Sequence, residues 1–131
     1  MKTLPLLLCL IFIFSFSCTK NVERNFNLLE ISDMVRKGDP DMKTVLGKDM
    51  DAGISCTTYG PGCLSARRMM VRRVDMGVVE FQNPNQARVV AKKIDQYYLG
   101  NWVFDDVVGE PVLEEFMAEY LKAHRPALEK E

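Results

Sequence analysis

Between residues 77 and 123 the spacing of hydrophobic residues changes twice from strand-like to helix-like. Valine and phenylalanine predict a strand over 77–81, and an aromatic and β-branched run predicts another over 102–108. Each strand is followed by an apolar stripe at helical spacing, which predicts helices over 84–98 and 111–123. The stripe of the first helix consists of Ala87, Val90, Ala91, Ile94 and Tyr98.

Capping residues mark both ends of the first of these helices. Asn83 is expected to cap its amino end, with Pro84 at the first helical position and Gln86 completing a capping box. Gly100 is expected to end the helix as a left-handed cap. These signals support a helix over 84–98.

Two further helices are predicted upstream. Asn27 and Glu30 form a capping box before an apolar stripe that ends at Gly38. Pro40 is expected to begin a second, short helix that ends at Gly47. We interpret both helices as packing elements rather than partner-binding ones. The stripe of the first consists of Leu28, Leu29, Ile31, Met34 and Val35.

The segment before the 77–81 strand predicts a β-hairpin. Residues 68–73 would form its first strand and residues 75–77 its turn, with a single bent strand as the alternative. Alternation along a strand would divide the local arginines between two faces, which favours a solvated edge over a binding patch. These arginines are Arg67, Arg68, Arg72 and Arg73.

These elements predict a small α+β fold with a short antiparallel sheet and helices packed on one face. The chain has 131 residues, which suits one domain. We place that domain at 27–125, after a polar tether at 18–26. The charged residues 126–131 are expected to be a frayed tail.

The amino end has the features of an export signal. Residues 1–17 contain a basic start and a short apolar core, which predict a secretory signal peptide. The sequence Ser15-Phe16-Ser17-Cys18 resembles a bacterial lipobox. The resemblance implies cleavage before Cys18 and attachment of diacylglycerol to its sulfur, so that lipid chains anchor the protein in a membrane. A plain secretory leader is the alternative.

The position after the lipidated cysteine bears on the choice of membrane. Thr19 stands where an aspartate would resemble the inner-membrane retention signal of enteric bacteria. We therefore expect a periplasm-facing lipoprotein in the bacterial envelope, with the outer membrane favoured over the inner.

Cys56 and Cys63 remain as a pair after the leader is removed. Export to an oxidising compartment favours a disulfide between them, and Gly60-Pro61-Gly62 supplies the chain reversal. Two alternatives stay open. The pair could be redox-active, or the two sulfurs could bind Cu(I) together with Met69 and Met70. Core packing is the preferred interpretation of the methionines.

Residues 77–84 (GVVEFQNP), followed by Ala87, resemble the third strand and second helix of an RNA recognition motif. The resemblance implies a partly ferredoxin-like strand-helix-strand unit. Such motifs stack bases on aromatic rings in this strand, whereas the chain has Val78 there. A net charge of −1 supplies no basic field. Together with the secretory leader, this excludes nucleic acid as the expected partner.

Five carboxylates lie close together in the sequence before and within the last helix, and the chain has one histidine, His124. Carboxylates near a helix amino end are favourable on electrostatic grounds alone. A structural or solvated role is therefore preferred over a cation site or acid–base catalysis. The residues concerned are Asp105, Asp106, Glu110, Glu114 and Glu115.

Taken together, the sequence predicts a non-enzymatic envelope lipoprotein that requires no cofactor and binds a protein partner or assists envelope assembly. Exposed aromatic residues would then be the contacts, with Tyr59, Tyr97 and Trp102 as candidates. The alternative is a periplasmic protein that handles metal or redox equivalents through Cys56 and Cys63.

Overall fold

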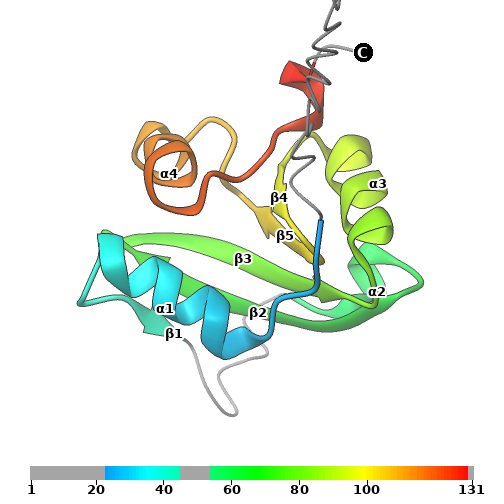
Figure 1. Cartoon of the computed structure of the whole chain (residues 1–131), viewed down its shortest axis with the longest axis horizontal. Helices are drawn as coiled ribbons and strands as arrows, with labels where there is room; N and C mark the ends of the chain where they lie inside the picture. The colour runs from blue at the N-terminus through cyan, green and yellow to red at the C-terminus, as the bar shows by residue number, and fades with distance from the viewer. Residues whose placement is uncertain (1–22, 45–53, 130–131) are drawn as a thin grey trace, which may run out of the picture.

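The computed structural model of the chain describes residues 23–44 and 54–129. Its centre is a five-stranded antiparallel sheet in the order β1-β2-β3-β5-β4 (Figure 1). The strands are β1 Lys43–Thr44, β2 Cys63–Val71, β3 Val74–Phe81, β4 Tyr97–Leu99 and β5 Trp102–Asp105. The helices are α1 Leu28–Gly38, α2 Cys56–Tyr59, α3 Pro84–Ile94, α4 Pro111–Phe116, η2 Met117–Leu121 and η3 Pro126–Leu128.

The predicted α+β class and antiparallel sheet are confirmed, but the helices cover both faces of the sheet rather than one. Helices α1, α4 and η2 pack on one face, while α3 packs on the other (Figure 1). The reason lies in strands that are apolar on both sides. Trp102 and Phe104 enter the first core, whereas Val103 between them enters the second.

The order of elements is ferredoxin-like in part. β5 pairs antiparallel with both β3 and β4, so β3 and β4 run parallel with β5 between them. Helix α3 connects these two parallel strands, which gives a split β-α-β unit. The sheet departs from that topology on the other side of β3, where β2 precedes β3 as its hairpin partner, whereas the β-α-β-β-α-β pattern has there a strand that follows the second helix.

The hairpin is confirmed, but its turn lies at Arg72–Arg73 instead of the predicted residues 75–77. Both arginines have positive φ values, 49° and 65°, and Val71 pairs directly with Val74. Two positive φ values identify the two-residue turn type that normally selects Asn-Gly. Two arginines are therefore an unusual choice, which explains the misplaced turn.

Helix α3 begins as predicted but ends earlier. The Asn83 side chain accepts the Gln86 backbone N–H, whereas the Gln86 side-chain oxygen has no partner, so the capping box is only half formed. Asp95 ends the helix at φ 55°, a left-handed conformation that aspartate tolerates. Tyr97–Leu99 then form β4, and Gly100 lies in the β4–β5 turn.

The other predicted helices have mixed outcomes. The Asn27–Glu30 capping box and the end of α1 at Gly38 are confirmed. A helix beginning at Pro40 is wrong, because Lys43–Thr44 pair with β2; residues 45–47 lie outside the described ranges. The closing helix is confirmed as α4 continued by a π-helical turn to Leu121.

Both ends of the predicted domain boundary need correction. Residues 23–26, assigned to the tether, pack on the fold: the Phe26 N–H donates to Asn101, and Trp102 donates to the Phe26 carbonyl. Residues 126–129, assigned to a frayed tail, form η3 and an ion pair from Glu129 to Arg88. The leader and Cys18 lie outside the described residues. Within the described residues, no helix has the length and apolar character needed to span a membrane.

Candidate functional site

The predicted Cys56–Cys63 disulfide is present. It joins the first residue of α2 to the first residue of β2, with the two Cα atoms 5.4 Å apart. Gly60–Gly62 reverse the chain between them, with positive φ at both glycines. Because both sulfurs are used in this bond, neither is a thiolate that could bind a soft metal ion.

The structure does not bring the alternative soft-metal ligands together. Met69 is fully buried in the core beneath α1, whereas Met70 is on the opposite side of β2 and 38% exposed. Successive side chains of a strand point to opposite faces of the sheet, as these two do. Among the described residues, no three His, Cys, Asp or Glu side chains are grouped to hold a metal ion.

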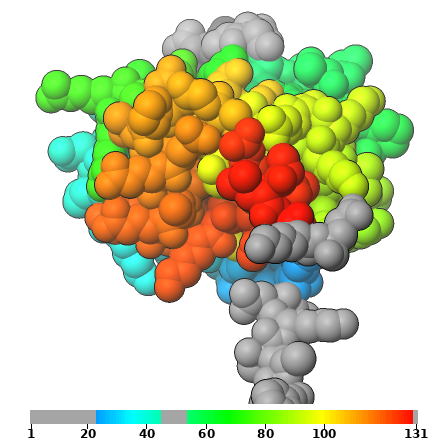
Figure 2. Space-filling view, turned by 90° about the horizontal axis from the view of Figure 1, so that it is seen from above, coloured from blue at the N-terminus to red at the C-terminus, as the bar shows by residue number. Residues whose placement is uncertain are grey.

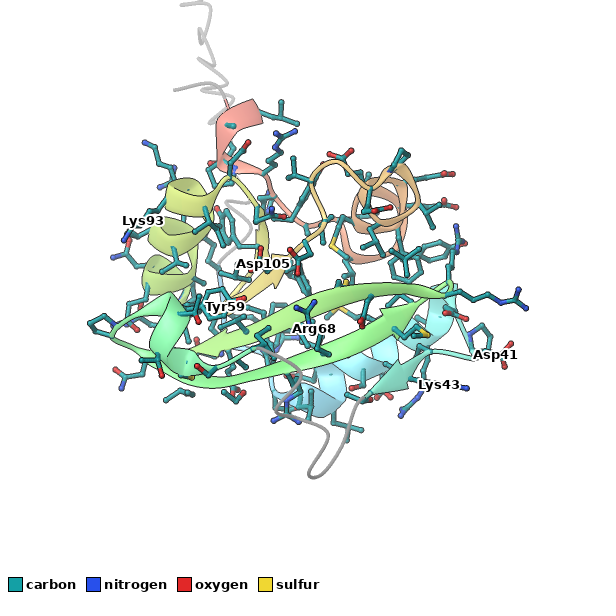
Figure 3. The ribbon with its side chains drawn as sticks, turned by 180° about the vertical axis from the view of Figure 1, so that it is seen from behind. Asp41, Lys43, Tyr59, Arg68, Lys93 and Asp105 are labelled. Atoms are coloured by element: carbon teal, nitrogen blue, oxygen red, sulfur yellow. A yellow bond between two sulfur atoms is a disulfide. The ribbon has the colours of Figure 1, made fainter. Side chains whose placement is uncertain are left out.

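Helix α2 is fastened to the sheet by a side-chain hydrogen bond. The Tyr59 hydroxyl donates to Asp105 Oδ2 over 2.6 Å, above the backbone of Gly77 (Figure 3). A Cβ at Gly77 would lie 2.8 Å from Ile54 Cδ1, so glycine allows this close approach. Burial, and then the bond to Asp105, raise the pKa of Tyr59 above its usual range, so its hydroxyl acts as a donor at neutral pH.

The carboxylates that are close in sequence serve separate contacts. Asp105 accepts the Tyr59 hydroxyl and the Asp106 N–H, and Asp106 pairs with Arg68 at 2.9 Å. Glu114 Oε1, on α4, lies 3.8 Å from the guanidinium of Arg125, the residue before η3. Glu110 and Glu115 are exposed. The five side chains therefore do not converge on one site.

Two of the three aromatic candidates for partner contact are buried, so that prediction is wrong for them. Trp102 is fully buried, with its indole N–H bonded to the Phe26 carbonyl, and Tyr97 is 9% exposed. The error has a physical cause: β4 and β5 are covered on both faces, so their aromatic side chains pack inside. Tyr59 is half-buried and held by Asp105.

An open groove lies beside the β2–β3 turn, a region the sequence suggested only as a solvated edge. This hairpin groove has a volume of about 610 Å³. It is open to solvent, and the exposed thioether of Met70 contributes an apolar surface. The groove is lined by Asp39, Asp41, Lys43, Met70, Arg72 and Arg73.

The charged groups of the hairpin groove are of two kinds. Arg72 makes two contacts within the fold. Its backbone N–H donates to Asp39 Oδ2 at 2.6 Å, and its guanidinium lies 5.3 Å from the centre of the Phe116 ring. Lys43 and Arg73 are exposed and make no side-chain hydrogen bond or ion pair with any residue the structure describes. Figure 3 shows Lys43 and Asp41 at this end of the molecule.

The lining of the hairpin groove has three cationic side chains and two carboxylates, so its cations are in excess. Lys43 and Arg73 make no ion pair with the described residues, so the groove favours a carboxylate ligand, and Met70 favours an apolar group beside it. The signal in the sequence was Val71-Arg-Arg-Val74, two polar residues between β-branched ones. That pattern marks a two-residue turn, but the glycine and asparagine that usually identify one are missing.

Comparisons with protein-family models, curated proteins and solved structures gave no match to this chain. A function is therefore inferred from the structure itself, namely from the disulfide loop, the hairpin groove and the surfaces at the ends of the described chain.

Proposed function

We propose that the protein is a lipid-anchored lipoprotein of the bacterial envelope whose folded part is a non-enzymatic protein-binding module. The anchor is the diacylglycerol-modified Cys18 that the lipobox resemblance implies, in a periplasm-facing position with the outer membrane favoured. The partner site is the hairpin groove. The observation that carries the binding role is a pair of cations in that open groove, Lys43 and Arg73, which make no ion pair with the residues the structure describes.

The conformation of the β2–β3 turn supports this role. A non-glycine residue at positive φ costs roughly 1–2 kcal/mol, and such strain is concentrated at functional sites. Arg73 has φ 65° and no ion pair among the described residues that would offset this cost. The turn therefore presents the Arg73 guanidinium at a cost in stability. Such a cost is expected if the guanidinium contacts an external ligand.

The groove also lies away from the proposed anchor. Strand β3 begins at Val74, beside the hairpin groove, and ends at Phe81, where residues 25 and 26 reach the sheet through Gln82 and Asn101. Eight residues in a strand span about 23 Å between first and last Cα. A partner could thus reach the groove while the other end of β3 stays near the membrane.

A non-enzymatic role is supported by the separate duties of the candidate catalytic groups. The Tyr59 hydroxyl donates a hydrogen bond to Asp105, and its raised pKa keeps it protonated, so it is a poor proton donor in catalysis. Asp106 pairs with Arg68. These side chains hold α2 and the end of β5 in place.

Intact mass of the mature protein tests the anchor. We expect a non-reduced mass that begins at Cys18 and includes acyl chains. Thiol alkylation should add nothing before reduction and should modify Cys56 and Cys63 after it. An unacylated product that remains in the soluble fraction would overturn the anchor. Free thiols at both positions would favour the metal- or redox-handling alternative.

Photo-crosslinking in intact cells tests the partner site. A photoreactive residue in place of Asp41, which is exposed and lines the groove, should give a specific crosslinked protein while both cations are kept, and the matched control is Val89, 59% exposed on α3. Arg73→Glu should abolish the crosslink from position 41 because it reverses the charge. A crosslink that persists in Arg73→Glu, or one equally strong from position 89, would exclude the groove.

A further inference from the structure

The chain that leaves the fold toward Cys18 is held firmly up to Glu23. The Tyr98 hydroxyl donates to Glu23 over 2.8 Å, Phe26 is bonded to Asn101, and Trp102 donates to the Phe26 carbonyl. Gly100 permits the close approach, because a Cβ there would overlap the Arg24 carbonyl oxygen and the Phe26 ring. Residues 23–26 are therefore part of the fold and not a linker.

This attachment shortens the spacer between Cys18 and the folded part to residues 19–22. Covalent geometry limits the step from residue 18 to residue 23 to about 18 Å. The headgroup layer is itself several ångströms thick, so the surface around Glu23 must lie at the membrane if Cys18 carries lipid.

A second cavity opens on that surface. This anchor-end groove, of about 310 Å³, lies where residues 23–26 meet the chain after η2. Figure 2 shows the C-terminal segment in red, between α4 in orange and α3 in yellow-green, with the N-terminal residues in blue at the lower edge. The groove is lined by Glu23, Arg24, Phe26, Leu99, Gly100, Leu121, Lys122 and His124.

Three of the polar side chains in the anchor-end groove can donate hydrogen bonds, and the fourth is the Glu23 carboxylate. Lys122 is exposed and has no ion pair with the described residues, and the ring nitrogens of His124 make no hydrogen bond with them. Arg24 is paired with Glu30 at 3.0 Å. The Glu23 carboxylate, the acidic group of the lining, already accepts the Tyr98 hydroxyl.

The end of the described chain, which carries an exposed apolar side chain, lies close to Glu23 of the anchor-end groove. Tyr98 shares its hydroxyl between Glu23 and Glu129, which places the end of the described chain next to its beginning. Leu128, one residue earlier, is 68% exposed. Cations beside exposed apolar groups are typical of surfaces that rest on a membrane.

We infer that this end of the protein rests on the bilayer and that the anchor-end groove binds the phosphate of a phospholipid headgroup. Lys122 and His124 donate to the phosphate oxygens, while Leu128 contacts the acyl boundary. The inference rests on the proposed lipidation of Cys18. It adds an orientation, with the anchor-end groove on the membrane and the hairpin groove at the far end of β3.

The test uses the acylated mature protein in phosphatidylethanolamine–phosphatidylglycerol vesicles that contain nitroxide-labelled headgroups. Ala127→Cys places a fluorophore at the anchor end, and Lys43→Cys places one at the hairpin groove. Each new cysteine is the free thiol, because Cys56 and Cys63 are joined and lipid occupies Cys18. We expect severalfold stronger quenching at position 127 than at position 43. Equal quenching at both would overturn the orientation.

The headgroup contact is tested by charge reversal. Lys122→Glu should reduce the quenching at position 127, while the same charge reversal at Lys37, an exposed residue in the last turn of α1, should leave it unchanged. Excess inorganic phosphate separates the two sources of the ligand. Quenching that persists in phosphate supports a headgroup, and quenching that is lost assigns the groove to free phosphate and overturns the lipid assignment. No effect of Lys122→Glu would also overturn it.

These outcomes can be told apart from failure of the proposed function. A protein without acyl chains by mass, which does not float with vesicles, contradicts the anchor itself. An acylated protein that floats but shows equal quenching at positions 127 and 43 retains the anchor and contradicts only the orientation.

Discussion

The Tyr59 hydroxyl donates a 2.6 Å hydrogen bond to Asp105, which joins the last residue of α2 to the last residue of β5. Helix α2 has only four residues, too few to be stable alone. The Cys56–Cys63 bond closes the chain around it, and Tyr59 fixes the closed loop over Gly77. The disulfide and the hydrogen bond should therefore act together.

This coupling predicts that Tyr59→Phe costs about 1–2 kcal/mol of unfolding free energy in the oxidised protein, because a half-buried bond to a carboxylate is lost. Reduction of the disulfide alone should cost about 2.5 kcal/mol from loop entropy. After reduction, Tyr59→Phe should cost less than half as much, because the loop no longer presents the ring. The wild-type protein and Tyr59→Phe, each in oxidised and reduced form, make up a thermodynamic cycle of four species. Urea unfolding with and without reductant measures the stability of all four.

Thr58→Ala is the matched control for that cycle. Thr58 neighbours Tyr59 in α2, is exposed, and makes no side-chain hydrogen bond with the described residues. Its replacement should change stability by less than about 0.5 kcal/mol. An equal cost of Tyr59→Phe in oxidised and reduced protein would show that the two links are independent.

The same hydrogen bonds predict instability at alkaline pH. Burial and then a carboxylate partner raise the pKa values of Tyr59 and Tyr98, by bonds to Asp105 and Glu23 respectively. Unfolded tyrosines ionise near the ordinary value of 10.0, while these two keep their protons in the fold. Above that pH the unfolded state binds fewer protons, so stability falls as pH rises.

Urea midpoints between about pH 8 and pH 11 check this expectation, since the ordinary tyrosine pKa lies within that interval. Tyr59→Phe and Tyr98→Phe should each reduce the steepness of the decline, and the double variant should reduce it further. An unchanged decline in the double variant would attribute alkaline unfolding to other groups.

Local signals in the sequence predicted the parts of the fold that they control directly. The Asn27 cap, the Asn83-Pro84 helix start and the Cys56–Cys63 pair all appear as expected. Failure came where tertiary packing decides. Tyr98 fits both a helical stripe and a strand, and β5 pairing selects the strand. The spacing of hydrophobic residues does not decide whether Trp102 is exposed or buried. In the structure it is buried, and residues 23–26 contribute to its burial.

The hairpin groove could not be predicted for a related reason. It is formed by residues near α1, on β1 and at the β2–β3 turn, which are up to 34 positions apart in the chain. Lys43 belonged to a predicted helix, and Arg72 and Arg73 to a predicted strand. Only the observed pairing of β1 with β2 brings these cations to one place.

The strained turn predicts that Arg73→Gly stabilises the protein. Glycine adopts φ 65° without a Cβ penalty, and the gain should be about 0.5–1 kcal/mol after its greater unfolded-state entropy is subtracted. Arg73→Ala keeps the Cβ and should give no such gain. Both variants remove the guanidinium, so both should weaken the crosslink from position 41. A stabilised Arg73→Gly that retains full crosslinking would separate the strain from partner binding.

The last prediction concerns the boundary of the folded part. A chain that begins at residue 27 loses the Phe26 carbonyl, which leaves the buried Trp102 indole N–H without its partner. An unsatisfied buried donor costs about 1–3 kcal/mol, and Asn101 and Tyr98 lose bonds as well. We therefore expect thermal unfolding at a clearly lower temperature than for a chain that begins at residue 23. Tryptophan fluorescence should also shift to the red, because water reaches Trp102. If the two chains have identical melting temperatures and fluorescence, residues 23–26 belong to the tether and not to the fold. The spacer between Cys18 and the folded part would then be longer than residues 19–22.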